Sequence, residues 1–126
     1  VASLEELLHL EEQTFSEKLF ELIDEKKLED VQVYQAANLD RKLFSKLRRK
    51  NYQPSKNTVL ALIVGMQLNL EEAKELLTYA GFALAPSNKT DIIVSFFLEK
   101  GQKFDIYVIN DALVKMGQKA LGNSIE

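Results

Sequence analysis

The stretch from Val59 to Met66 constrains the fold more than any other part of the sequence. It reads Val-Leu-Ala-Leu-Ile-Val-Gly-Met and follows Pro54, which interrupts the backbone donors, and Ser55, which can cap a new helix. A helix that is apolar nearly all round must be covered nearly all round by other parts of the chain. The stretch therefore predicts a central buried helix with the remaining elements packed about it.

Helical signals also dominate the segments on either side of this stretch. Ser3 to Glu6, Thr14 to Glu17 and Asn69 to Glu72 fit the capping-box pattern, in which two side chains satisfy free backbone N–H groups at a helix start. Apolar residues then recur three and four positions apart, and glycines such as Gly81 and Gly117 stand where helices would end. We expect a short first helix from about residue 4, and further helices over about residues 15–25, 30–37, 40–49, 59–66, 70–80, 92–100 and 105–116.

The run from Phe104 to Ile109 is rich in β-branched and aromatic residues, so a strand competes with a helix there. A lone strand would have no partner in an otherwise helical chain, and we therefore expect a helix. Ala85 to Asn88 is the only turn-rich linker, and the tail from Gln118 onward is small and polar, so we expect that tail to fray. The expected fold class is all-α.

Length and composition favour one compact domain over residues 1–126, because a chain of this length with 46% hydrophobic residues can bury a core. The absence of cysteine excludes disulfides, thiolate catalysis and cysteine-ligated metals. No apolar run approaches the roughly 20 residues that cross a bilayer, and the acidic, leucine-rich start is unlike a secretory leader. We expect a cytoplasmic protein with no membrane association. Because residue 1 is valine, we also expect the chain to be processed or excised from something longer.

Basic residues are concentrated between Asn38 and Pro54. This segment holds six basic residues, all three arginines among them, and one acid, whereas residues 1–30 carry ten acids and three lysines, a local charge of −7. Asp40 is suited to cap a helix in which Phe44 and Leu47 face the core. A basic surface of this kind can bind phosphate although the whole chain carries a net charge of −3. The residues expected to face outward or to flank the apolar stripe are Arg41, Lys42, Ser45, Lys46, Arg49 and Lys50.

Two short helices are expected to meet at Asn38. Asparagine tolerates a left-handed backbone, so the helix over residues 30–37 can stop there and the basic helix can start almost at once. Two helices joined this tightly make a helix-turn-helix. The segments Val33-Tyr-Gln-Ala-Ala-Asn-Leu-Asp40 and Pro54-Ser-Lys-Asn-Thr-Val-Leu-Ala-Leu62 resemble the Cro and phage-repressor (lambda-repressor-type) helix-turn-helix family, as do the positions of Phe44 and Leu47.

This resemblance implies a five-helix helix-turn-helix core over about residues 14–84 and a C-terminal extension of two helices over about residues 87–117. It implies a bacterial regulator of transcription that binds duplex DNA through a recognition helix over residues 40–49. Within that helix it places Arg41, Lys42 and Ser45 near base edges, and Lys46, Arg49 and Lys50 near the DNA backbone. Members of the family commonly bind two half-sites as homodimers, but the sequence does not identify a self-complementary face. The extension is expected to pack Phe96, Phe97, Ile106 and Ile109 onto the core.

Three positions depart from the family pattern. Tyr34 stands where alanine is usual, Arg48 stands where glutamate is common, and Leu43 is expected on the groove-facing side. Leucine reads no hydrogen-bond pattern, so Leu43 could contact a thymine methyl group or could join Tyr52 in a protein-binding surface. The alternative function is therefore a protein–protein interaction or regulatory accessory domain of a larger bacterial protein, with a repressor-like fold and no DNA binding.

A second resemblance covers residues 14–116, including Ser87-Asn-Lys-Thr-Asp-Ile-Ile93. Here the chain is similar to a helical module at the C-terminal end of some bacterial macro-domain proteins. The chain itself contains no ADP-ribose-binding macro domain.

No catalytic, cofactor-binding or metal site is expected. His9 is the only histidine, so a metal would need carboxylates and a single nitrogen ligand. The glycines are scattered and form no phosphate-cradling loop. Adjacent acids on a helix point about 100° apart and suit a solvated face better than acid–base chemistry. Such pairs occur at Glu5-Glu6, Glu11-Glu12 and Glu71-Glu72. We therefore expect no enzymatic activity.

Overall fold

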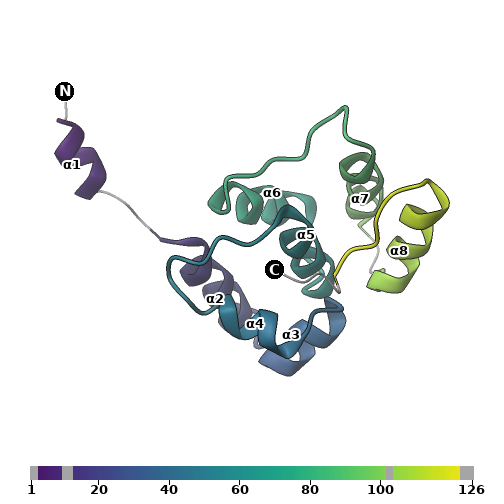
Figure 1. Cartoon of the computed structure of the whole chain (residues 1–126), viewed down its shortest axis with the longest axis horizontal. Coiled ribbons are helices and arrows are strands. Elements are labelled where there is room, and N and C mark those ends of the chain that lie inside the picture. Colours follow the sequence, from purple (N-terminus) through teal and green to yellow (C-terminus); the bar gives the residue numbers. More distant parts are fainter. Residues whose placement is uncertain (1–2, 10–12, 102–103, 123–126) are drawn as a thin grey trace.

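A computed structural model of the protein describes residues 3–9, 13–101 and 104–122. Over these residues the fold is all-helical, with eight α-helices and no strand (Figure 1). The all-α expectation is confirmed. In the run where a strand competed, Asp105 caps α8 and residues 106–109 form its first turn. The helices are α1 (Leu4–His9), α2 (Phe15–Glu25), α3 (Asp30–Ala36), α4 (Arg41–Lys46), α5 (Lys56–Gly65), α6 (Leu70–Tyr79), α7 (Lys89–Glu99) and α8 (Ile106–Lys115).

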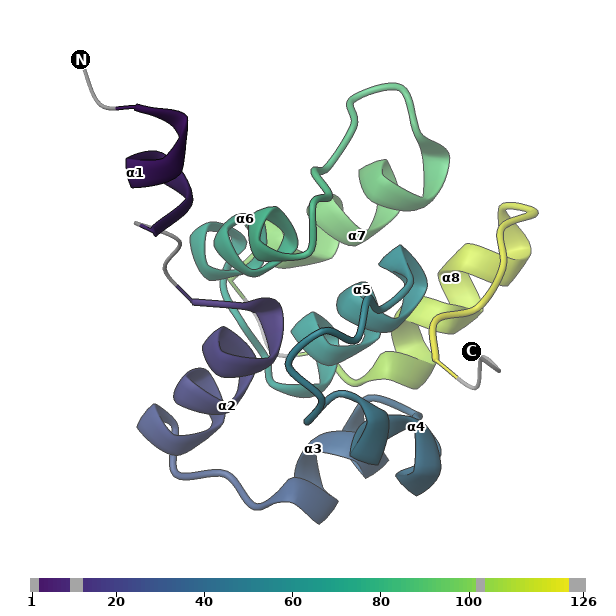
Figure 2. The same cartoon turned by 60° about the vertical axis from the view of Figure 1, so that its left-hand side comes forward.

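The helix α5 lies at the centre of the molecule, as its sequence predicts. Every residue from Thr58 to Val64 is buried. The helices α3, α6 and α8 pack against α5, α2 packs against α6, and α7 packs against α6 and α8 (Figure 2). The helix α1 stands apart from this assembly in Figures 1 and 2. The all-round apolar character of α5 is thus matched by neighbours on several sides.

The predicted caps begin the helices that surround α5. The Thr14 hydroxyl accepts the Glu17 backbone N–H at 3.3 Å, and the Glu17 carboxylate accepts the Thr14 backbone N–H at 3.2 Å. Asn69 and Glu72 form the same reciprocal pair at 2.8 and 3.0 Å. Each cap satisfies backbone donors that a helix leaves open and contributes about 1 kcal/mol. Local sequence therefore determines where α2 and α6 begin.

The packing of the two C-terminal helices differs from the prediction at Phe96. Ile106 and Ile109 are buried and Phe97 is half-buried against the core, as predicted, whereas Phe96 is 54% exposed. Adjacent residues on a helix point about 100° apart, and α7 instead turns Val94 fully into the core. Phe96 therefore lies on the outer face of α7.

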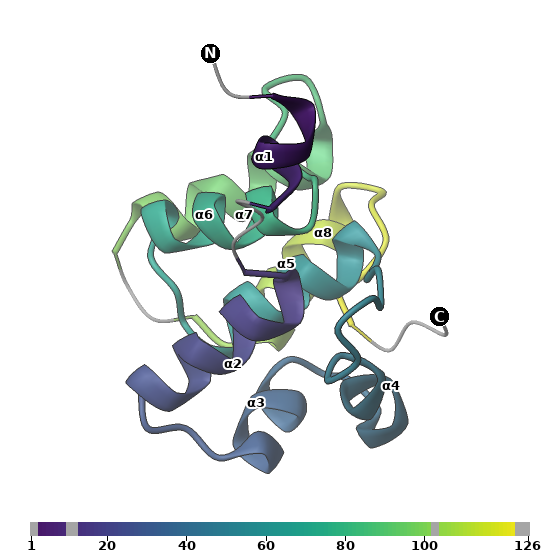
Figure 3. The ribbon, with the colours of Figure 1, turned by 90° about the vertical axis from the view of Figure 1, so that its left-hand side faces the viewer.

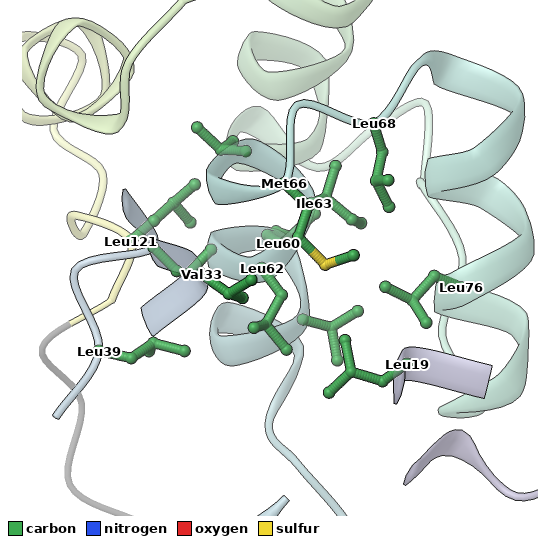
Figure 4. Close-up of a cluster of buried hydrophobic side chains, with 14 of the residues drawn as sticks. Leu19, Val33, Leu39, Leu60, Leu62, Ile63, Met66, Leu68, Leu76 and Leu121 are labelled. Atoms are coloured by element: carbon green, nitrogen blue, oxygen red, sulfur yellow. The ribbon is translucent and has the colours of Figure 1, made fainter. Parts of the chain in front are cut away.

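The end of the described chain is not frayed, contrary to the expectation for the tail. Leu121 is fully buried and Gly122 is also buried, although neither belongs to a helix. In Figure 4, Leu121 lies on the same side of α5 as Val33 and Leu39, opposite Leu19. Leu121 thus packs into the core although the residues around it are small or polar, and it brings the end of the described chain next to the α3–α4 region.

Candidate nucleic-acid interface

The connection between α3 and α4 is a tight turn centred on Asn38. This residue has a positive φ of 56°, as predicted for the end of α3. The Leu39 N–H donates to the Tyr34 carbonyl at 2.8 Å, and the Asn38 N–H donates to the Gln35 carbonyl at 3.1 Å. These two bonds make a Schellman motif, which closes the last turn of a helix. The Asp40 carboxylate then accepts the Lys42 N–H at 3.2 Å, so α4 starts soon after the turn.

The helix α4 is shorter than the predicted span of residues 40–49. It covers Arg41–Lys46, and the following N–H groups of Arg48 and Arg49 donate three residues back rather than four. The chain must soon reach Pro54, which disfavours a helical conformation for the residue before it. Residues 47–51 form turns and a bend, and α4 has fewer than two full turns.

Five of the six predicted DNA-binding residues line one shallow depression on the surface. Its walls carry four cations and one hydroxyl, and no acidic side chain lines it. Figure 3 shows α4 at the edge of the molecule beside α3. All five side chains are exposed except that of Lys46, which is half-buried. The residues lining the depression are Arg41, Lys42, Ser45, Lys46 and Arg49.

Lys50, the sixth predicted residue, is exposed but lies outside this depression. Its charge acts on Glu17 at the start of α2. Hydrogen bonds from the backbone and hydroxyl of Thr14 lower the pKa of Glu17, and the Lys50 cation adds a smaller effect in the same direction. The Lys50 cation is therefore near enough to Glu17 for its charge to act on the start of α2.

Leu43 does not face outward, and the interpretation of it as a surface anchor is wrong. It is 4% exposed, and its neighbours Phe44 and Leu47 are 3% and 1% exposed. These three residues span one continuous arc of the short helix, so the whole inner half of α4 is buried. Tyr52, the other proposed contact, is half-buried and packs against the core. Leu43 can contact neither a thymine methyl group nor a protein partner while α4 is folded in place.

Arg48 points away from the basic depression. Its guanidinium lies 4.4 Å above the centre of the Phe20 ring and pairs with the Asp30 carboxylate. Phe20 meets Phe44 edge-on with ring centres 5.7 Å apart, and Tyr34 meets Phe44 at 5.6 Å. Two of the three departures from the repressor pattern, Tyr34 and Arg48, therefore belong to an aromatic and cationic stack between α2, α3 and α4. Sequence spacing placed Tyr34 and Arg48 individually but did not reveal this stack.

A glycine not assigned to the site by sequence also shapes it. A Cβ added to Gly65, the last residue of α5, would lie 2.7 Å from the Ala37 backbone nitrogen. The glycine thus permits the close approach of α3 to α5. Ala37 itself is fully buried. The base of the α3–α4 turn therefore rests directly on the central helix.

Metal sites, free acid pairs and membrane-spanning helices are the other features that could assign a function to the described part of the chain. Residues 3–9, 13–101 and 104–122 contain no group of three or more histidine, cysteine or acidic residues that could hold a metal ion, and the His9 side chain lies outside what the structure describes. Glu72 serves the α6 cap and pairs with Lys26 at 3.0 Å, while Glu11 and Glu12 lie outside the described residues. No helix in the described ranges is both long and apolar enough to cross a membrane.

Comparison with known proteins adds no family assignment. No family model, no curated protein and no solved structure matches the chain. The function is therefore inferred from the geometry of the α3–α4 region.

Proposed function

We propose that this chain is a non-catalytic helix-turn-helix domain that binds duplex DNA through the outer face of α4. The observation that carries the proposal is the depression lined by four cations and one hydroxyl, with no acid, directly after a tight helix–turn–helix connection. DNA presents closely spaced phosphates, and a surface of one sign binds them with little competition from its own acids. In this proposal α2 to α6 form the five-helix repressor-like core, and α7 and α8 extend it.

The residues take distinct roles in the proposed complex. Arg41, Lys42 and Ser45 lie on the exposed face of α4 and would approach base edges. Lys46 and Arg49 would contact phosphates on the flank, with Lys50 further out. Six helical residues are only about 9 Å long. So short a helix reaches few base pairs, and we expect phosphate contacts to supply most of the affinity.

Salt dependence is the direct measure of those phosphate contacts. If Lys46, Arg49 and Lys50 each neutralise one phosphate, the logarithm of the binding constant falls with the logarithm of salt concentration with a slope of about −2.7. A fourfold rise in salt would then weaken binding by about 40-fold. Wild-type protein that shows no salt-sensitive binding to duplex DNA, even at low ionic strength, would rule out this function.

Alanine variants of the outward cations test the surface itself. Arg41→Ala and Lys42→Ala should weaken binding and relax the preference for particular base pairs, whereas Arg49→Ala should make the salt slope shallower by about one because one phosphate fewer is neutralised. All three side chains are exposed, so the free energy of unfolding should change by less than about 0.5 kcal/mol in each variant. Lys74→Ala is the matched control, because Lys74 is exposed on α6, away from α4 (Figure 1). An equal loss of affinity in Lys74→Ala would show that only overall charge matters.

The second candidate function is a protein-interaction or regulatory accessory domain without DNA binding. Leu43 is buried and cannot support this function. The supporting observation is the outer side of α7, where Ile92 and Phe96 are 49% and 54% exposed. Both border a groove that Leu84 and Pro86 also line. Phe96→Ser should abolish capture of a partner under this function and leave DNA binding unchanged under the first. Arg41→Ala should do the opposite: it should leave partner capture unchanged under the second function and weaken DNA binding under the first.

A further inference from the structure

The turn between α3 and α4 is enclosed by two glycines that come from distant parts of the chain. Gly65 approaches Ala37 from α5, and Gly122 approaches Ala37 and Asn38 from the end of the described chain. A Cβ added to Gly122 would lie 2.6 Å from the carbonyl oxygens of both Ala37 and Asn38. Gly122 also has a φ of +78°, which glycine adopts readily. The end of the described chain therefore lies directly on the turn that starts the basic helix.

Two asparagine side chains hold this segment through its backbone. Asn57 donates to the Ala120 carbonyl at 3.0 Å and accepts the Gly122 N–H at 2.9 Å. Asn110 donates to the Leu121 carbonyl at 3.0 Å and accepts the Leu121 N–H at 2.7 Å. Each amide thus both donates and accepts, much as a neighbouring strand would. Because Asn57 belongs to α5 and Asn110 to α8, the segment is fixed to two helices at once.

The turn takes part in the same arrangement. The Asn38 side chain donates to the Leu121 carbonyl at 3.4 Å, so that carbonyl accepts from both α8 and the turn. The Leu121 side chain is fully buried. Asn38 therefore supplies the left-handed turn and also a contact to the segment, and its position depends on both.

We propose that residues 120–122 form a strap that positions the α3–α4 turn, and through it the DNA-binding face of α4, with Asn57 and Asn110 as the residues that hold the strap. The link to DNA rests on the function proposed above. A helix of six residues cannot maintain its own conformation, so its place depends on what holds its ends. Without the strap, the turn loses the Gly122 backbone and its hydrogen bond to Leu121 together. The binding-competent arrangement of α4 then becomes less populated, and the apparent affinity falls in proportion.

Gly122→Ala, compared with Gly117→Ala, tests the strap. Both glycines have a positive φ, 78° and 76°, so alanine strains the backbone similarly at each. Only at Gly122 would the new Cβ collide with the turn, because nothing lies within 4 Å of the corresponding position at Gly117. The difference between the two variants therefore isolates the approach to Ala37 and Asn38. Asn110→Ala is a milder second variant, which removes both amide bonds without adding atoms, should Gly122→Ala fail to fold.

Hydrogen exchange and DNA binding are measured on the same proteins, each comprising residues 1–126. In Gly122→Ala, the amides of Asn38 and Leu39 should exchange at least about tenfold faster relative to the α6 amides, as a local opening requires. The dissociation constant for duplex DNA should rise about tenfold if the competent population falls to one tenth. Gly117→Ala should change neither quantity to that extent.

Two results would overturn the proposal. Equal acceleration of exchange in the turn and in α6 would show that residues 120–122 merely support the whole fold. Faster exchange in the turn with unchanged DNA affinity would show that the strap does not position the binding face. If wild-type protein binds no DNA, the proposed function and the strap's role in it both fail, but the exchange comparison still decides whether the strap holds the turn.

Discussion

Removal of the Lys56 cation should be among the most destabilising changes at a charged residue. The Asp91 carboxylate is 2% exposed and lies 2.5 Å from the Lys56 ammonium. It also accepts the Ala85 N–H at 2.8 Å. The pair joins the first residue of α5 to the first turn of α7 and to the linker between the two parts of the fold. Lys56→Met keeps most of the apolar stem but leaves a buried carboxylate without its cation.

The surroundings of the Asp91 carboxylate set the range of stability loss expected for Lys56→Met. Breaking a fully buried ion pair by removing one partner costs about 3–5 kcal/mol. The Lys56 side chain is 27% exposed and the Ala85 N–H remains, so water and one hydrogen bond offset part of this loss. We therefore expect Lys56→Met to lower the free energy of unfolding by roughly 2–4 kcal/mol. A domain with a total stability of about 5–15 kcal/mol would show this clearly.

Urea denaturation of matched variants measures the difference. Lys115→Met is the control, because Lys115 pairs with Asp111 at 2.9 Å while both side chains are highly exposed. Solvent screens such an exposed i,i+4 pair, so its loss should change stability very little. The double variant Lys56→Met with Asp91→Leu should recover part of the loss, since it removes the unpaired charge. If Lys56→Met costs no more than Lys115→Met, the pair is not the link that its burial indicates.

Three further outcomes are expected from the core and the caps. Leu62→Ala, at a fully buried position of α5, should cost about 2–5 kcal/mol in chemical denaturation, and a negligible loss would show that α5 is not the central helix. Asn69→Ala should cost about 0.5–2 kcal/mol in thermal or urea unfolding, because its side chain accepts a free N–H group at the start of α6; an unchanged midpoint would contradict that role. Burial acts to raise the pKa of Glu72, but the Asn69 backbone hydrogen bond and Lys26 outweigh it and hold the pKa below its ordinary value. The folded carboxylate therefore adds stability above the ordinary glutamate pKa, and this contribution is lost as pH falls through the lower folded value; Lys26→Met should reduce this acid-dependent loss, and an unchanged pH profile would refute the assignment.

The parts of the fold that were predictable are those with local causes. Capping-box residues lie three positions apart, so Thr14 and Asn69 indicate the starts of α2 and α6 without any knowledge of the tertiary fold. The left-handed backbone of Asn38 follows from the tolerance of asparagine for this conformation and from the two helical patterns that meet at this residue. The buried course of α5 follows from its composition alone. In each case the deciding atoms lie within a few residues of one another.

For the candidate site, the sequence predicted the exposed basic residues but not which side chains of α4 are buried or which other helices they contact. Five basic or polar residues gather in one depression because they share the outward arc of a single short helix and the turn that follows it. Whether Leu43 lies inside or outside depends on which elements flank α4, and helical spacing carries no information about those neighbours. The same limit applies to Arg48, whose partners Phe20 and Asp30 come from two other helices. Arg48 counts among the basic residues of the segment from Asn38 to Pro54, but its side chain packs on Phe20 and pairs with Asp30.

The missing information is mostly non-local. Asn57 and Gly122 are 65 residues apart, and nothing near either residue indicates that an amide side chain will bind the backbone of a distant segment. Gly65 and Gly122 look like ordinary helix-end or tail glycines, yet a Cβ at either one would strike Ala37. The sequence therefore shows that both positions lack a side chain, but it does not show that the Ala37 backbone packs closely against each of them.

The division of α4 into a buried inner arc and a charged outer arc separates stability from binding. Leu43, Phe44 and Leu47 hold a helix too short to persist alone, so their loss should lower stability and DNA affinity together. Arg41 and Lys42 make no comparable contribution to packing, so their loss should lower affinity alone. The strap adds a third class, because residues 120–122 touch the turn without belonging to the proposed contact surface. Variants there should reduce affinity while the charge of the surface and its salt slope remain unchanged, since the same number of phosphates is neutralised in each bound complex.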